Sequence, residues 1–343
     1  MPRYRVNCST MMFLVILQGA GVVLFFSWYT QLSPCDHNPP TSGSSFLGQV
    51  FSQHPSVFYL MEALRMAVRD LLRSVFQCDF SVMESYLPEY PNVSSLFMWS
   101  HSRALCSPPI CSLTPRNQFR IAGVEQACDS YSHVVYKDVR LFELESLYPL
   151  LQDSNLDLRI IHLVRDPRAV VRDNAIVLEQ KRIKEAEVQY QVMQEICRSH
   201  VRINERAVLK PPPFLKGRYK LVRYEDMARN PLEEINAMYQ FVGLEMTTEL
   251  ATWIYKVTHG KGKGSIKEAF KITSRSATNV SQAWRTMLPY NKVRRIQEVC
   301  KGAMSLLGYR TVNSEKEQKR LDIDLLVPRE PYQSKARNQT NQN

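Results

Sequence analysis

The sequence lacks the common patterns of nucleic-acid-binding proteins. No zinc-finger, RNP or basic-zipper motif occurs, and the 44 Lys and Arg residues are spread along the chain. They outnumber the 33 Asp and Glu residues and leave a formal net charge of +11. Such a charge favours polyanionic partners, such as anionic lipid, a phosphorylated cofactor or an acidic glycan, although a basic surface can also serve solubility alone. We predict no nucleic-acid partner.

Two classes of site are also missing. No GK[ST] sequence follows a small-residue loop, so a nucleotide kinase or other P-loop NTPase is disfavoured. Cys106 and Cys111 have neither a second close cysteine pair nor a nearby histidine pair, so their spacing does not indicate zinc. No internal repeat is present. We expect no metal.

What the sequence does contain is a long apolar run near its start. Met11 to Tyr29 follows Arg3 and Arg5 and is interrupted only by Gln18, small residues and a serine. This length predicts a transmembrane signal anchor over 11–29, with a cytosolic tail over 1–10 and a lumenal body. A cleaved signal peptide is the alternative, but its apolar region would be shorter and a small-x-small site should follow.

Cysteines and glycosylation sequons agree with a lumenal body, where disulfides persist. Seven cysteines follow the apolar run: Cys35, Cys78, Cys106, Cys111, Cys128, Cys197 and Cys300. An odd number leaves at least one free or paired between chains, so a homo-oligomer stays open. Sequons stand at Asn92, Asn279 and Asn338.

Strand and helix patterns alternate in the remainder of the chain. Strands are predicted over Val57–Leu60, His133–Tyr136, Leu158–Val164 and Lys220–Tyr224. Helices are predicted from about Ser42 to Phe51, over Leu64–Phe76 and Phe142–Leu151, from about Pro231, and over Lys292–Leu307 with Gly308 as the C′ residue. The alternation predicts an α/β fold with a mostly parallel sheet flanked by helices. We divide the lumenal part into a stem (30–41), one domain (42–313) and a polar tail (314–343).

Two predicted junctions carry groups that suit anions. Ser42-Gly43-Ser44-Ser45 leads into a helix, where small residues and backbone N–H groups can surround a phosphate. Arg165-Asp166-Pro167-Arg168 directly follows the best strand, where Arg165 can meet a phosphate bidentately. Taken singly, a serine-rich N-cap and a surface salt bridge are simpler interpretations.

In combination, five segments carry a resemblance to a known family. They are SGSSFLGQVFSQHPSVFYLME (42–62), SYSHVVYKDVR (130–140), LRIIHLVRDPRAVVR (158–172), YKLVRYEDMARNPLEEI (219–235) and NVSQAWR (279–285). In this order they resemble the Golgi galactose, N-acetylglucosamine and N-acetylgalactosamine 6-O-sulfotransferases, with most similarity to the intestinal and corneal N-acetylglucosamine enzymes. The resemblance implies a sulfotransferase fold with a P-loop-like parallel sheet, and residence in the Golgi membrane.

The resemblance also implies a reaction and its residues. The donor is 3′-phosphoadenosine 5′-phosphosulfate (PAPS), and the acceptor is the 6-hydroxyl of N-acetylglucosamine in keratan sulfate or a mucin-type O-glycan. The 5′-phosphosulfate site corresponds to Ser42, Gly43, Ser44, Ser45 and Phe46. The 3′-phosphate site corresponds to Arg165, Asp166, Pro167, Arg168, Ala169, Val170, Val171 and Arg172, with Asp173 following directly.

Further roles can be assigned within this resemblance. Glu62, at the end of a predicted strand, is our candidate for the base that takes the acceptor proton, with a solvated carboxylate as the alternative. Lys137 and Arg140 support cofactor or acceptor, and Trp284 with Arg285 helps to close the site. A structural role is an alternative for each of them. The Glu225-Asp226 pair is most simply structural, tying a strand end to neighbouring helix N-termini.

The chain departs from the family at three places. Thr41 stands where the family has an arginine, the cation expected at the leaving group. Pro39 and Pro40 stand where a buried strand should lead into the first junction, so the first strand of the sheet is expected to be missing. A serine that helps to hold the 3′-phosphate is absent, and Asp173 would repel a phosphate there. The alternative to an enzyme is therefore a catalytically impaired lumenal membrane protein on the same scaffold.

Overall fold

A parallel sheet of five strands lies at the centre of the protein. The computed structural model describes residues 12–18, 43–61, 68–81, 102–106, 121–138, 141–171, 186–262 and 274–328. The strands are β1 (Met12–Gln18), β2 (Val57–Met61), β3 (His133–Asp138), β4 (Asp157–Val164) and β5 (Tyr219–Arg223). Their order is β2-β3-β1-β4-β5, and every neighbouring pair is parallel. The predicted α/β class with a parallel sheet is confirmed, and β2 to β5 lie where the sequence places strands.

The central strand corrects two expectations. β1 joins the two halves of the sheet, because Val15 pairs with Tyr136 of β3 on one side and with Ile160 of β4 on the other. The first strand is therefore present, although it comes from Met12–Gln18 and not from the residues before the first junction. The same residues were predicted as the start of a membrane helix, and here they are a strand. A short apolar run suits a strand buried on both faces as well as it suits a helix, so periodicity cannot decide between them.

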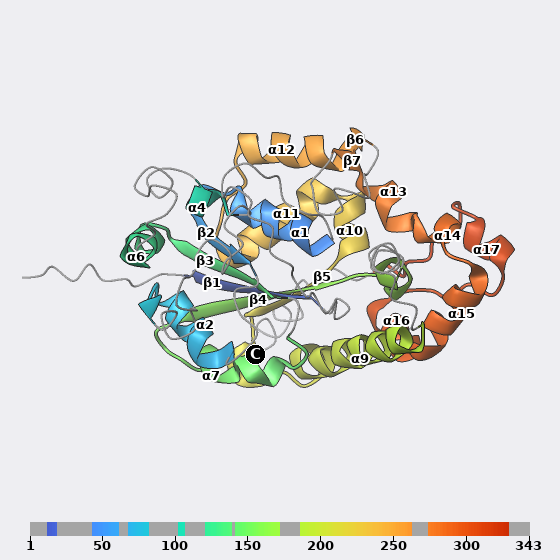
Figure 1. Ribbon diagram of the computed structural model, residues 1–343, viewed down its shortest axis with the longest axis horizontal. Helices are drawn as coiled ribbons and strands as arrows, with labels where there is room; N and C mark the ends of the chain where they lie inside the picture. Colours follow the sequence, from blue (N-terminus) through green and yellow to red (C-terminus); the bar gives the residue numbers. More distant parts are fainter. Residues whose placement is uncertain are drawn as a thin grey trace, which may run out of the picture.

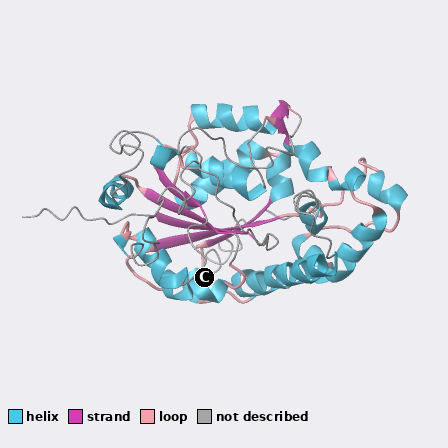
Figure 2. Cartoon of the chain, viewed as in Figure 1, coloured by secondary structure: helices cyan, strands magenta, loops and turns pink. Residues whose placement is uncertain are grey.

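Helices cover both faces of the sheet, with strands in the middle layer (Figures 1 and 2). On one face are α1 (Gly43–Ser52), α10 (Tyr224–Arg229), α11 (Pro231–Val242) and α12 (Thr248–Thr258). On the other are α2 (Val68–Phe76), η3 (Leu144–Leu147) and α7 (Tyr148–Leu151), and the short helices α4 (Arg103–Cys106) and α6 (Ile121–Asp129) share their core. Alternate residues of β2 and β3 point to opposite faces: Tyr59 and Val135 pack with α1, whereas Phe58 and Val134 pack with α2.

A third hydrophobic cluster lies beyond the carboxyl ends of the strands. It is formed with α9 (Ala186–Asn204), α14 (Trp284–Met287), α15 (Tyr290–Val299) and α16 (Lys301–Leu307). The remaining elements are η4 (Glu205–Leu209) and η5 (Pro213–Leu215), which pack in the first cluster with α2 and α7, α13 (Ala277–Gln282), α17 (Glu315–Lys319), and a small antiparallel pair beside α12, β6 (His259–Lys261) and β7 (Arg275–Ser276). The predicted helix 292–307 is two helices that meet at Cys300, and Gly308 ends the second with φ +77° as expected.

The packed domain continues past its predicted end at residue 313. Leu325 and Leu326 are buried in the third cluster, and the side chain of Gln318 is fully buried. Apolar residues at 323–327 explain this, because burying them against α14 and α16 removes them from water. The predicted polar tail thus contributes its first half to the core.

In the parts of the chain described here, no helix has the length and apolarity needed to cross a membrane. Residues 19–42, which hold the remainder of the predicted anchor and the stem, lie outside them.

Candidate functional site at the carboxyl ends of the strands

The first predicted junction places a helix N-terminus at the edge of the sheet. α1 begins at Gly43, so Gly43, Ser44 and Ser45 form its first turn, which contains no acidic residue. Free N–H groups at a helix start attract anions. The expected helix start is therefore confirmed, and its chemistry fits a phosphate or sulfate group. Thr41 and Ser42 lie outside the described residues.

A close approach of α1 to the sheet brings Lys137 toward this junction. A Cβ at Gly48 would lie 2.2 Å from the Tyr59 hydroxyl oxygen and 3.4 Å from the Lys137 Cδ, so glycine is what allows the contact. Lys137 is the penultimate residue of β3, pairs with Ile16 of β1 and is 1% exposed. Its side chain lies on the face that α1 covers. The structure thus brings a buried lysine to the helix that starts at the first junction.

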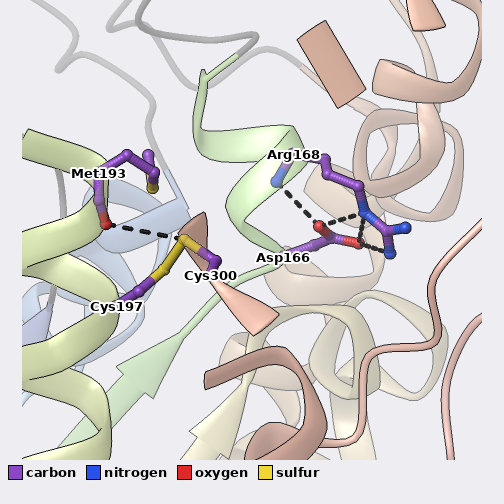
Figure 3. The surroundings of a disulfide bond; sticks show 5 residues. All are labelled: Asp166, Arg168, Met193, Cys197 and Cys300. Atoms are coloured by element: carbon purple, nitrogen blue, oxygen red, sulfur yellow. Dashed lines mark hydrogen bonds and ion pairs between the residues drawn. A yellow bond between two sulfur atoms is a disulfide. The ribbon is translucent and has the colours of Figure 1, made fainter. Parts of the chain in front are cut away.

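The second junction is more tightly bonded than the sequence predicts (Figure 3). The Arg168 side chain is fully buried, and its Nε and Nη2 donate to the two carboxylate oxygens of Asp166 at 2.9 and 2.7 Å. Its Nη1 donates to Gln297 of α15 at 2.9 Å, and its guanidinium carbon lies 4.1 Å from the centroid of the Trp284 ring. Every guanidinium nitrogen of Arg168 is therefore already bonded, and a direct bond to a phosphate would have to replace one of these.

Asp166 also satisfies the first turn of the short helix over 167–171. Its carboxylate accepts the backbone N–H of Arg168 at 2.9 Å, and its carbonyl accepts those of Ala169 and Val170. This is the N-cap role expected for an Asp-Pro pair. Arg165, directly after β4, lies with its guanidinium 4.4 Å from the centroid of the Tyr224 ring. Among the described residues, we consider Arg165 as the candidate for an ionic contact to an anion at the second junction.

A residue from the next strand end holds this junction in place. Glu225, in the first turn of α10, accepts the backbone N–H of Asp166 at 3.0 Å and the hydroxyl of Tyr309 at 2.8 Å. Burial, with the negative charge of Asp166 beside it, raises the pKa of Glu225 to about 7, and Arg165 opposes the shift. The expectation that Glu225 ties a strand end to a helix N-terminus is confirmed. Tyr309 and Gln297 were missed, since neither belongs to a recognisable motif.

Comparison with known proteins identifies the chain. Residues 38–308 match the sulfotransferase domain. Human carbohydrate sulfotransferase 6 is 54% identical over 328 residues, covering 84% of this chain and 83% of the relative. Mouse carbohydrate sulfotransferase 5 is 49% identical over 379 positions, covering 96% and 95%. The chain belongs to the carbohydrate sulfotransferases. The sulfotransferase domain of a curacin biosynthetic pathway is similar in structure, with a TM-score of 0.46, 17% identity, and coverage of 88% of this chain and 99% of that one.

The alignment with the mouse carbohydrate sulfotransferase is longer than this chain. It extends over 379 positions, more than the 343 residues of this chain. It therefore contains stretches of the relative that this chain lacks.

Trp284 and Arg285 lie at the second junction of this sulfotransferase but contact its carboxyl-terminal segment. Arg285 is 3% exposed and donates to the backbone carbonyls of Gln318 and Ile323 at 3.0 Å each, and to that of Arg320. Burial, together with the charge of Arg168, lowers the pKa of Arg285. The two residues hold residues 318–323 and Arg168 in place, and closing of the site stays a prediction.

Several predicted site residues lie outside the described part: Glu62, Arg140, Arg172, Asp173, Asn92 and Asn338. Asn279 is exposed on α13, as a glycosylation site requires. Among the described residues there are two disulfides, Cys78–Cys128 and Cys197–Cys300, the second beside the second junction (Figure 3). Among the described residues no group of three or more His, Cys, Asp or Glu could hold a metal ion.

Proposed function

We propose that this protein transfers a sulfuryl group from PAPS to the 6-hydroxyl of N-acetylglucosamine in glycans such as keratan sulfate or mucin-type O-glycans. The observation that carries the proposal is the completed first junction: β1 fills the centre of the sheet, and α1 starts at the sheet edge with an uncharged, small-residue turn. A carbohydrate sulfotransferase needs an anion site at this place.

The residues present fit the donor in part. The first turn of α1 can hold the 5′-phosphosulfate through Gly43, Ser44, Ser45 and Phe46, and Arg165 can meet the 3′-phosphate. The nitrogens of Arg168 are bonded within the protein, so this residue holds the second junction in place through Asp166 and Gln297. PAPS supplies an activated sulfuryl group when bound.

A cation and a base complete the chemistry. As the bond between sulfur and the acceptor O6 forms, the bond from sulfur to the phosphate oxygen breaks and that oxygen gains negative charge. We propose that Lys137, buried beside α1, stabilises this charge in place of the arginine that Thr41 replaces. Glu62, which directly follows β2 in the chain, takes the hydroxyl proton.

The two disulfides support a compartment that permits oxidation, and we propose the Golgi lumen. A type II membrane anchor over 11–29 uses the residues of β1. A span needs roughly 17 to 25 apolar residues, and residues 19–29 alone are too few. One molecule therefore uses Met12–Gln18 either in the membrane or in the sheet, and we propose that the active form uses them in the sheet.

The test is transfer of radiolabelled sulfate from PAPS to an N-acetylglucosamine-terminated acceptor. The full chain is required, since a truncation at residue 30 removes β1. We expect transfer above background, a loss on the order of 100- to 1000-fold for Lys137→Met, and no loss for the exposed control Lys216→Met. No transfer by folded protein contradicts the proposal.

An impaired scaffold is the second candidate, favoured by Thr41 and by the bonded state of Arg168. The variant Thr41→Arg distinguishes an enzyme from a non-catalytic scaffold. Activity that appears only in this variant indicates a damaged enzyme, and inactivity of folded Thr41→Arg protein indicates a scaffold that no longer catalyses.

A further inference from the structure

Glu225 lies directly behind the loop that the proposed function assigns to the 3′-phosphate. Its side chain bonds to the backbone N–H of Asp166, one residue from Arg165, and the residue is 6% exposed. It lies in one of the five family segments (219–235), but the resemblance assigns it no role in binding the donor. Gain or loss of a proton by Glu225 therefore changes the charge directly behind this loop.

The charges that face Glu225 come from four sides. They are Arg165, Asp166 and Arg168 of the second junction, Tyr309 after α16, Arg223 of β5 with Asp226 of α10, and Arg229 and Arg285 across a small cavity. Most of these are paired: Arg168 with Asp166, Arg223 with Asp226, and Arg229 with Asp324. Within this group, Glu225 is the carboxylate with no arginine bonded to it in the described structure.

A small cavity lies beside Glu225. About 30 Å³ of space is lined by Asp166, Glu225, Arg229, Ser281 and Trp284, among others. This volume and its polar lining suit a water molecule. A proton can therefore reach the carboxyl group without unfolding of the surrounding helices.

Protonation of Glu225 changes charge but not connectivity. A neutral carboxyl group still accepts from the Asp166 N–H through its carbonyl oxygen, and its own O–H can donate to Tyr309. The loop therefore keeps its position while one negative charge behind it disappears. Its net potential then becomes more favourable to a bound phosphate.

We propose that Glu225 is a positioning residue whose protonation state sets the affinity of the second junction for the nucleotide 3′-phosphate. This inference rests on the proposed function. Neutral Glu225 holds the loop and favours the anion, whereas ionised Glu225 holds the loop and repels the anion.

The sign of the pH effect follows from the environment of Glu225. Its pKa is raised to about 7, so the carboxyl group loses its proton between about pH 6 and 8. Affinity for the 3′-phosphate should therefore fall as pH rises through this window. The second ionisation of a phosphate monoester, near pH 6, acts in the opposite direction, so a decrease above pH 7 cannot come from the ligand.

The experiment measures calorimetric binding of 3′-phosphoadenosine 5′-phosphate and of 5′-AMP between pH 6 and 8. We compare the full chain with Glu225→Gln, which keeps an acceptor for Asp166 and mimics the neutral acid. A full charge acting across roughly 10 Å changes affinity on the order of tenfold. We expect the bisphosphate to bind the native chain about tenfold more weakly at pH 8 than at pH 6. We expect Glu225→Gln to bind tightly throughout and more tightly than the native chain at pH 8.

A merely structural role predicts the reverse, namely weaker binding by Glu225→Gln at every pH. That result, or identical pH profiles for the two proteins, overturns the inference and leaves the proposed function intact. If the bisphosphate binds no better than 5′-AMP at any pH, the proposed donor site fails and the inference fails with it. Should Glu225→Gln not fold, Tyr309→Phe serves instead: loss of the hydroxyl donor moves the midpoint to higher pH, and an unmoved midpoint contradicts the proposal.

Discussion

The two junctions that form the candidate site are held in different ways. The first depends on β1, a strand separated from α1 by residues 19–42, and on the contact of α1 with Tyr59 and Lys137 at Gly48. The second follows its strand directly and is fixed by Arg168, Glu225, Gln297 and the nearby Cys197–Cys300 disulfide. A chain that lost sequence before its first junction could therefore keep the second unchanged.

This difference teaches where the protein is vulnerable. The first junction depends on one strand recruited from the apolar amino-terminal run, and losing that strand separates β3 from β4. The second junction has several independent bonds, so losing one weakens it without removing it. Substitutions at the two places should differ accordingly.

The largest effect is expected in β1. Val15→Pro removes a backbone N–H from a strand paired on both sides, where proline is not tolerated, and should prevent cooperative folding. Circular dichroism during heating measures this. Leu24→Arg is the matched control, because it places a charge in the predicted anchor outside β1.

The pair of variants also tests the alternative use of the apolar run. If the strand forms, Val15→Pro loses the cooperative thermal transition of the native chain. If Val15→Pro folds normally while Leu24→Arg loses the carbonate-resistant membrane fraction, the anchor is correct and the strand is wrong.

A smaller effect is expected at Arg168. Arg168→Met leaves the buried carboxylate of Asp166 without its partner, which typically costs about 3 to 5 kcal/mol. Urea unfolding should show this as a lower midpoint with an unchanged slope. Arg310→Met, a surface arginine with a single 3.4 Å contact to a carbonyl, should change stability by about 0.5 kcal/mol or less. Equal effects of the two substitutions would contradict the view that the second junction is buried and bonded.

Strand positions could be predicted from the sequence, but the source of the central strand could not. Leu158–Val164 is apolar and β-branched, and it forms β4 as expected. Met12–Gln18 has the same character, yet its position beside Arg3 and Arg5 favours a membrane helix when the sequence is read alone. Only its pairing with β3 and β4 distinguishes the two interpretations.

The candidate site was predictable in its motifs and not in their internal bonding. The Asp166-Pro167 N-cap follows from local chemistry, and so does the helix after Ser42. That Arg168 faces Asp166 and Gln297 depends on α15, which lies 129 residues further along the chain at Gln297. Long-range packing of this kind leaves no local pattern to recognise.

A moderate effect is expected where α1 contacts the sheet. Gly48→Ala places a methyl group against the buried Tyr59 hydroxyl, and such overpacking typically costs about 1 to 3 kcal/mol. It should also move α1 away from Lys137 and lower sulfate transfer. Gly302→Ala, in α16 with no atom near its added Cβ, should stabilise the protein by about 0.5 to 1 kcal/mol. Thermal unfolding of both variants checks this. If Gly302→Ala also lowers the unfolding temperature, the loss in Gly48→Ala cannot be attributed to overpacking between α1 and Tyr59.

The smallest effect is expected at the outer edge of the second junction, where Arg229 of α10 donates to both carboxylate oxygens of Asp324 at 3.1 and 2.6 Å. Half-exposed pairs contribute about 0.2 to 1 kcal/mol and weaken with salt. The hydrogen bond from Arg229 lowers the pKa of Asp324. Its contribution is therefore present above the ordinary pKa of an aspartate and is lost as pH falls through the lowered value. A double-mutant cycle with Arg229→Met and Asp324→Asn should give a small coupling energy at pH 7 that disappears in 1 M salt. A coupling energy as large as the loss at Arg168 would mean that the carboxyl-terminal segment supports the second junction as strongly as its buried ion pair does.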